Sequence, residues 1–182
     1  DDVTLTPSEG LEISEDGTLL LATCEGHVEF IGRSFQVKPT MDLKGNVDAT
    51  SGNVSALGDI HIHGDVCSGF SVRATGSVTI DGTVEAAVVE AGGDLIIRGG
   101  VQGNGQATLR SHRSVYVRYM ESCSVYAREN VEAECIINCE VFSDGMVLVR
   151  SGRGKIMGGR IRAARQVSAD VIGSRSEMAT YI

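Results

Sequence analysis

A glycine-punctuated repeat constrains the fold of this chain more than any other feature. The segment GDIHIHGDV (58–66) returns as GSVTIDGTV (76–84), and a second short alternation follows each copy. Repeats of this length predict a solenoid in which each turn contacts only its neighbours. The starts of successive turns are 16 to 20 residues apart, whereas a left-handed β-helix is built from strict six-residue repeats. These spacings predict an all-β fold, a right-handed single-stranded parallel β-helix, with turns starting at Gly58, Gly76, Gly93, Arg113, Glu129, Gly145 and Arg165.

Two inward columns follow from aligning the turns, because alternate residues of a strand point to opposite faces. The first column pairs are Ile60/Ile62, Val78/Ile80, Leu95/Ile97, Val115/Val117, Val131/Ala133, Val147/Val149 and Val167/Ala169. The second column pairs are Val72/Ala74, Val89/Ala91, Leu109/Ser111, Val125/Ala127, Val141/Ser143 and Ile161/Ala163. The alternation predicts that all of these side chains line the core.

The outward columns test this register, because they were not used to build it. One column reads His63, Asp81, Arg98, Arg118, Glu134, Arg150, Asp170, and its charged neighbours mostly have opposite sign. Opposite charges across strands contribute about 0.2–1 kcal/mol each. A second column reads Arg73, Glu90, Arg110, Tyr126, Phe142, Arg162. It predicts a charge ladder at one end and an aromatic pair between arginines at the other.

Residues 1–44 lack the repeat and are predicted to form a small antiparallel β cap or entry segment. Glu15-Asp16-Gly17 lies between two apolar runs, which is a hairpin signal, and further alternating runs cover 27–31 and 34–37. An open strand edge invites pairing with another chain, so a stack of strands needs a cover at its end. The domain prediction is therefore a cap over 1–44 and a parallel β-helix of about seven coils over 45–182. A short first coil opens the β-helix at residue 45.

Composition narrows the class of function. A net charge of −8 argues against nucleic-acid binding, which needs a basic face. No stretch approaches 18 apolar residues, so no membrane insertion is expected. Five cysteines without metal-type pairs favour a reducing compartment. Acidic residues concentrate before residue 48 and basic ones after 150, which predicts a polar rod, although chance is as good an explanation. The missing initiator Met suggests a piece of a longer protein.

The order of these turns resembles the bacterial flagellar assembly protein A family. The resemblance rests on GNVDATSGNV, GDIHIHGDVCSGFSVRATGSVTIDGTVEAA, GGDLIIRGGVQGNG, KIMGGRIRAA and VIGS, and on SEDGTLLLATCEGHVEF before them. It implies a right-handed β-helix, a cytoplasmic location with the cell pole as one option, and a non-enzymatic role in flagellar assembly or polar organisation. Members usually carry further N-terminal sequence and a helical C-terminal segment. The family has no catalytic motif, so the resemblance assigns no catalytic residue and no cofactor.

A metal site is a minor alternative within the repeat. Asp59, His61, His63 and Asp65 alternate with buried residues and should face outward, and two histidines two apart on a strand can share a metal ion. A third ligand is needed, and Asp81 on the next turn is the candidate. The favoured interpretation is that His63 belongs to the charge ladder, so no metal is predicted.

Two cysteines are predicted to stack inside the solenoid. Cys123 and Cys139 occupy equivalent positions on adjacent turns, at a spacing that suits a disulfide. The favoured interpretation is a reduced pair of small apolar thiols in the core.

Surface residues offer two candidate docking regions. Gly152-Arg153-Gly154-Lys155 lacks the spacing of a phosphate-binding loop, so a basic patch with Arg160, Arg162 and Arg165 is favoured, and a solvated basic face is the alternative. Outward Ile96, Tyr116 and Leu148 fall in one column, which suggests self-association or partner binding. Tyr126 and Phe142 complete the predicted interaction surface.

The sequence therefore predicts a non-enzymatic scaffold that binds protein partners and, as one option, itself. Two alternatives stay open: a carbohydrate-binding or polysaccharide-modifying β-helix, and a polymerising element like the bactofilins. An enzyme would need clustered acidic or basic groups in a groove, and polymerisation would need uncapped solenoid ends.

Overall fold

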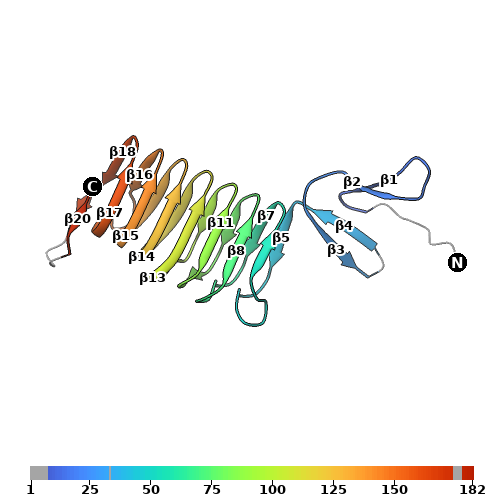
Figure 1. Cartoon of the computed structure of the whole chain (residues 1–182), viewed down its shortest axis with the longest axis horizontal. Helices are drawn as coiled ribbons and strands as arrows, with labels where there is room; N and C mark the ends of the chain where they lie inside the picture. The colour runs from blue at the N-terminus through green and yellow to red at the C-terminus, as the bar shows by residue number, and fades with distance from the viewer. Residues whose placement is uncertain (1–7, 33, 174–177) are drawn as a thin grey trace.

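The protein is an elongated stack of β-strands with two hairpins at its N-terminal end (Figure 1). The computed structural model describes residues 8–32, 34–173 and 178–182, and the regular elements within these ranges are all strands. We find no helix in this part of the chain that is long and apolar enough to cross a bilayer.

Among the strands that the structure describes, antiparallel pairing is confined to the first four. The hairpin of β1 (Leu11–Ile13) and β2 (Leu20–Ala22) forms where the sequence predicts it, and β3 (His27–Ile31) pairs with β4 (Ser34–Lys38). The remaining strands are β5 (Thr40–Leu43), β6 (Val54–Ala56), β7 (Asp59–Ile62), β8 (Ser71–Ala74), β9 (Val78–Ile80), β10 (Thr83–Val84), β11 (Val88–Ala91), β12 (Leu95–Ile97), β13 (Gly100–Ser111), β14 (Val115–Ala127), β15 (Val131–Ser143), β16 (Met146–Val149), β17 (Lys155–Ala163), β18 (Gln166–Ala169), β19 (Val171–Ile172) and β20 (Thr180–Tyr181).

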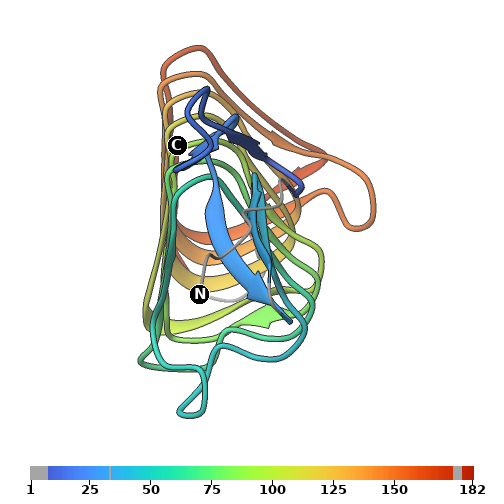
Figure 2. The same cartoon turned by 90° about the vertical axis from the view of Figure 1, so that its right-hand side faces the viewer.

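Parallel pairing builds three faces around a triangular cross-section (Figure 2). The first face stacks β5, β7, β9, β12, the starts of β14 and β15, and then β16 and β18. The second face stacks β10, the start of β13, the middle portions of β14 and β15, the start of β17, and β19. The third face stacks β6, β8, β11, the ends of the long strands and β20. The predicted β-helix is confirmed.

The core confirms the predicted register. Ile60 pairs with Val78, and the column continues through Leu95 and Val115 on the first face. Val72 pairs with Val89, which starts the equivalent column on the third face. Most of these side chains are fully buried in one continuous cluster along the stack. Each turn thus buries its apolar residues only against the turns beside it.

Parallel pairing begins before the domain boundary drawn from the sequence. β5 pairs in parallel with β7, so the solenoid starts at Thr40 and not at Gly45. The hairpins lie beyond this strand (Figure 1), and several of their apolar side chains remain exposed, including Val28, Phe30 and Phe35. The repeat is harder to recognise in the β5 turn because Pro39 precedes the strand where Gly58 precedes β7.

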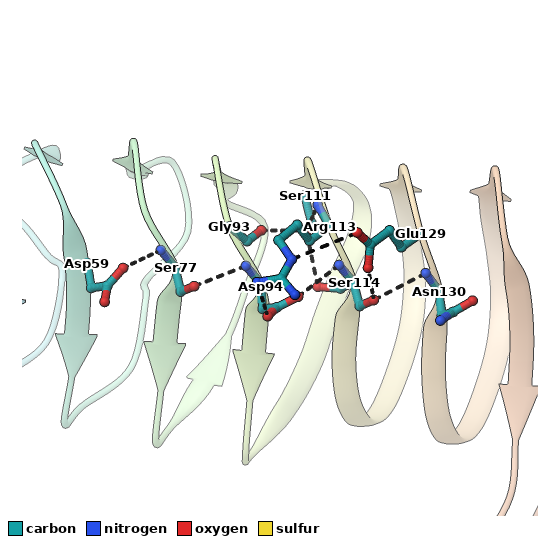
Figure 3. A network of polar contacts seen from close by, with 9 residues as sticks. All are labelled: Asp59, Ser77, Gly93, Asp94, Ser111, Arg113, Ser114, Glu129 and Asn130. Atoms are coloured by element: carbon teal, nitrogen blue, oxygen red, sulfur yellow. Dashed lines mark hydrogen bonds and ion pairs between the residues drawn. The ribbon is translucent and has the colours of Figure 1, made fainter.

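A polar ladder lies at the start of the first-face strands (Figure 3). In each step, a side-chain oxygen of one turn accepts a hydrogen bond from the backbone N–H of the next turn. The acceptors are Asp59, Ser77, Asp94, Ser114 and Asn130, with N···O distances of 2.7, 3.1, 3.1, 3.3 and 3.0 Å. The ladder satisfies backbone donors that the bend removes from the strand pairing, since an unsatisfied donor at a partly buried position is costly.

Candidate functional site

An outward apolar column crosses the first face. The register places Ile96 beside Tyr116, then Glu132, then Leu148. The Tyr116 residue is 37% exposed, and Ile96 and Leu148 are half-buried. The column lines a shallow depression of about 400 Å³. We call Ile96, Tyr116 and Leu148 the apolar column, which Glu132 interrupts between Tyr116 and Leu148.

Charged residues border the apolar column. Arg98, Arg118 and Arg150 line the depression together with Glu132 and Glu134, so arginines outnumber carboxylates. Arg118 Nε lies 3.3 Å from Glu134 Oε1. Arg98 Nη1 lies 2.9 Å from Asp81 Oδ1, which continues the ladder toward the N-terminal end. These two contacts join neighbours of opposite charge, as the outward column predicts.

The aromatic pair on the third face is a structural stack. Tyr126 and Phe142 lie parallel, with ring centroids 5.4 Å apart and an interplanar angle of 4°. The guanidinium carbon of Arg110 lies 5.4 Å from the Tyr126 ring, and that of Arg162 lies 5.8 Å from the Phe142 ring. Each ring face is therefore occupied by a neighbour along the stack, and the rings present their edges to solvent. The ladder of Arg73, Glu90 and Arg110 leads into this stack, with nitrogen–oxygen distances to Glu90 of 3.0 and 3.9 Å.

We expect Tyr126 and Phe142 to be energetically coupled. A double-mutant cycle with Tyr126→Ala and Phe142→Ala should give a coupling of about 0.5–1.5 kcal/mol in urea unfolding, because stacked rings contribute that much beyond buried area. The control cycle pairs Phe142→Ala with Tyr116→Ala on another face, where the two changes should add. Additivity in both cycles would contradict the stack.

The histidine cluster draws residues from three consecutive turns of the first face. His61 pairs with Asp42 of β5, and Asp81 follows β9 on the other side. Asp81 Oδ2 lies 3.0 Å from His61 Nε2 and 3.1 Å from His63 Nδ1. Asp42 Oδ1 lies 3.6 Å from His61 Nδ1 and 3.3 Å from His63 Nε2. Both histidines and Asp81 were identified from the sequence, but Asp42 was missed. The alternation over Thr40 to Leu43 could have identified it, because it marks a strand on which Asp42 faces outward.

The environment of Asp81 favours its charged form. Partial burial acts to raise the pKa of Asp81, but hydrogen bonds from His61 and His63 and the charge of Arg98 hold the pKa below its ordinary value. Asp59 and Asp65, which the sequence grouped with the histidines, instead accept backbone hydrogen bonds from Ser77 and Thr83. The cluster is therefore Asp42, His61, His63 and Asp81.

The predicted basic residues are divided between faces. Lys155 pairs with Cys135 on the second face, while Arg160 and Arg162 belong to the third face. A corner at Gly158 and Gly159, whose φ values are +69° and +83°, separates them. The guanidinium carbon of Arg160 lies 5.9 Å from the Tyr181 ring. The exposed residues Arg153 and Arg165 lie in the turns before β17 and after it.

Cys123 and Cys139 meet in the core, as their spacing predicts. Both are buried, and their Sγ atoms lie 3.5 Å apart without a disulfide. The Sγ of Cys139 also lies 3.1 Å from the Ile137 carbonyl oxygen, to which its S–H donates. The hydrogen bond to Cys139, together with burial, raises the pKa of Cys123. Protonated thiols of this kind are poor nucleophiles.

We expect only one thiol of the folded protein to react quickly with Ellman's reagent. Cys24 is exposed, and Cys67 is partly covered with a pKa raised by burial. Cys123, Cys135 and Cys139 are buried. In the native protein, Cys24 should label first and Cys67 slowly, while the other three react only in denaturant. Fast labelling of three or more thiols without denaturant would contradict the buried positions.

Comparison with known proteins identifies the family of this solenoid. Residues 39–182 match the model of the flagellar assembly protein A beta solenoid domain. The chain belongs to the flagellar assembly protein A family. The match to the flagellar assembly protein A domain begins beside β5, so it coincides with the parallel solenoid of the structure. Searches of curated proteins and of solved structures returned no match. The family predicted from the sequence is confirmed.

Proposed function

We propose that this solenoid is a non-enzymatic, cytoplasmic scaffold that binds protein partners during flagellar assembly. The apolar column is the observation that carries the proposal. Its position on a flat, ladder-stabilised face gives a partner a rigid surface to bind. Ile96 and Tyr116 are direct neighbours, and Leu148 follows on the far side of Glu132. Apolar groups gathered on one face and rimmed by polar ones mark interaction sites more often than scattered ones do.

The border of the apolar column indicates the chemistry of the partner. Arg98, Arg118 and Arg150 outnumber Glu132 and Glu134 around the depression. Arg98 and Arg118 already contact Asp81 and Glu134, so Arg150 is the arginine of this border that makes no ion pair among the described residues. A protein segment that combines apolar side chains with carboxylates complements this border, because complementary charges guide association. Arginine can also bind a carboxylate through two hydrogen bonds. We therefore propose an acidic, partly apolar protein segment as the occupant.

A test of this function removes the apolar column and leaves the fold intact. Thr79 and Ser168 occupy the same outward column, so hydroxyl side chains fit there. In cells that produce the parent protein with Tyr116→Ser and Leu148→Ser, we expect the flagellated fraction to fall several-fold. Thermal unfolding should show that the double variant still folds.

The matched control is Glu140→Ser, an exposed change on the third face. Cells with this control should assemble flagella as the parent strain does. Normal flagellation with the double variant would overturn the docking proposal, as would an equal defect in both strains. Light scattering of the purified protein tests the alternative occupant. If the parent protein is a dimer and the double variant is a monomer, the apolar column binds a second copy of the chain. That result would overturn the proposal of an acidic partner.

Two observations favour a scaffold over the alternatives raised by the sequence. The faces of Tyr126 and Phe142 are covered by neighbours, so this stack does not offer a ring face on which a sugar could lie. The hairpins lie beyond β5, which disfavours end-to-end polymerisation through that end (Figure 1). Both observations support protein binding through the side of the rod.

A further inference from the structure

The cluster of Asp42, His61, His63 and Asp81 has an organisation that the charge ladder does not explain. His61 and His63 lie on one side of β7 because Ile60 and Ile62 between them point into the core. Their ring centroids are 4.0 Å apart. Asp42 and Asp81 approach the pair from opposite sides, one from the preceding turn and one from the following turn. Each imidazole therefore has one nitrogen near each carboxylate.

Hydrogen-bond chemistry assigns the two sides different roles. A carboxylate can only accept hydrogen bonds, and a neutral imidazole has one donor and one acceptor nitrogen. Asp81 has the shorter contacts, 3.0 Å to His61 Nε2 and 3.1 Å to His63 Nδ1, so we assign these nitrogens as the donors. His63 Nε2 is also within hydrogen-bond distance of Asp42 Oδ1, at 3.3 Å, and a metal ion would replace any proton between these two atoms. The remaining nitrogens, His61 Nδ1 and His63 Nε2, then direct their lone pairs toward Asp42. Two nitrogen lone pairs and a carboxylate oxygen therefore converge beside Asp42, and a cation between them would be stabilised by all three.

The dimensions of this convergence fit a metal ion. The ligand atoms of Asp42, His61 and His63 all lie within 4.8 Å of one another. The two distances to Asp42 Oδ1 are 3.3 and 3.6 Å. Neighbouring ligands of a tetrahedral Zn²⁺ with bonds of 2.0–2.1 Å are separated by about 3.3 Å. The two distances to Asp42 Oδ1 are therefore close to the separation of neighbouring ligands around a tetrahedral ion.

We propose that Asp42, His61 and His63 bind one divalent transition-metal ion, such as Zn²⁺, and that Asp81 holds both imidazoles in the ligating orientation. Metal-binding histidines usually donate their second ring N–H to a carboxylate, and that is the position of Asp81. Arg98 in turn fixes Asp81 from the following turn, with 2.9 Å between Nη1 and Oδ1. Two imidazoles and one carboxylate favour Zn²⁺, Co²⁺ or Ni²⁺ over Mg²⁺ and Ca²⁺, which prefer oxygen ligands alone.

The site is open to solvent on one side. The side chain of Asp42 is 55% exposed and that of His63 is 40% exposed. Three protein ligands leave the fourth position of a tetrahedral ion to water or to a donor from another molecule. The three ligands lie on turns that precede the apolar column, and Arg98, which lines the depression, contacts Asp81 rather than a ligand.

Titration of the whole chain with ZnCl₂ tests the site. The Cys24→Ser background removes the exposed thiol, which is itself a candidate zinc ligand. We expect one Zn²⁺ per chain, competition by Co²⁺ with the visible absorption of a tetrahedral complex, and no competition by Mg²⁺. In ¹⁵N spectra of the histidines, Zn²⁺ should shift His61 Nδ1 and His63 Nε2.

Three variants separate the roles. Asp42→Ala should abolish stoichiometric binding. Asp81→Asn should keep one ion per chain but bind it about 10–100-fold more weakly, as expected for a carboxylate that orients ligands. His112→Ala, which removes an exposed histidine elsewhere on the rod, should bind like the parent. Circular dichroism of each metal-free variant verifies folding.

Several results would overturn the proposal. Absence of Zn²⁺ binding in the parent would do so directly. Equal affinity in the parent and Asp42→Ala would place the ion elsewhere. An unchanged affinity in Asp81→Asn would remove the positioning role, and binding of several ions per chain would indicate adventitious contacts only.

Discussion

Replacing Leu109 by alanine should lower the free energy of unfolding by about 2–5 kcal/mol. Leu109 is fully buried, and the register places it between Val89 and Val125 in the inward column of the third face. The cavity would lie inside a narrow solenoid, whose stacked strands can collapse toward it only by breaking their own ladders.

Urea unfolding measures this effect, with exposed Glu132→Ala as the control. Surface changes usually stay within about 0.5 kcal/mol. A loss below 1 kcal/mol for Leu109→Ala would show that the inward column is packed more loosely than the structure indicates.

Gly82→Ala should destabilise the protein by about 1–3 kcal/mol, because a side chain there overfills a packed corner. A Cβ atom at this position would lie 2.3 Å from Asp65 Oδ1 and 2.5 Å from the Gly64 carbonyl oxygen. Gly99 meets the Gly82 carbonyl oxygen in the same way, at 2.3 Å. Gly82 and Gly99 are thus required by the close approach of successive turns.

Gly45→Ala provides the matched control. A Cβ atom there meets nothing within 4 Å, and Gly45 does not have a positive φ angle. Alanine at a compatible position stabilises a protein by about 0.4–1 kcal/mol because it restricts the unfolded chain. In urea unfolding, we therefore expect Gly82→Ala to lower the free energy of unfolding and Gly45→Ala to raise it. Equal effects would show that corner packing does not decide where glycine occurs.

The sequence predicted the regular part of the fold in detail. Both inward columns, the outward columns and the Cys123–Cys139 contact have the register drawn from the alignment. This succeeded because strand alternation and a near-constant turn length fix which residues stack. The first turn was missed because Pro39 stands where later turns carry the glycine before the strand, and with it the role of Asp42 was missed.

Corner geometry lies outside what alternation can predict. Asp59 was predicted only to face outward beside the histidines, but its carboxylate accepts the Ser77 N–H and belongs to the ladder in Figure 3. The basic residues were read as one patch, but the corner at Gly158 divides Lys155 from Arg160. In both cases the outcome depends on how the backbone bends between strands.

Photo-crosslinking in cells tests the central claim, that the apolar column binds a component of flagellar assembly. The photoreactive residue benzoylphenylalanine would replace Tyr116 in the parent protein, or Glu140 on the third face as the control. We predict an adduct at residue 116 in which mass spectrometry identifies a flagellar assembly protein, and no such adduct at residue 140. No adduct at residue 116, or the same adducts at both positions, would contradict the account.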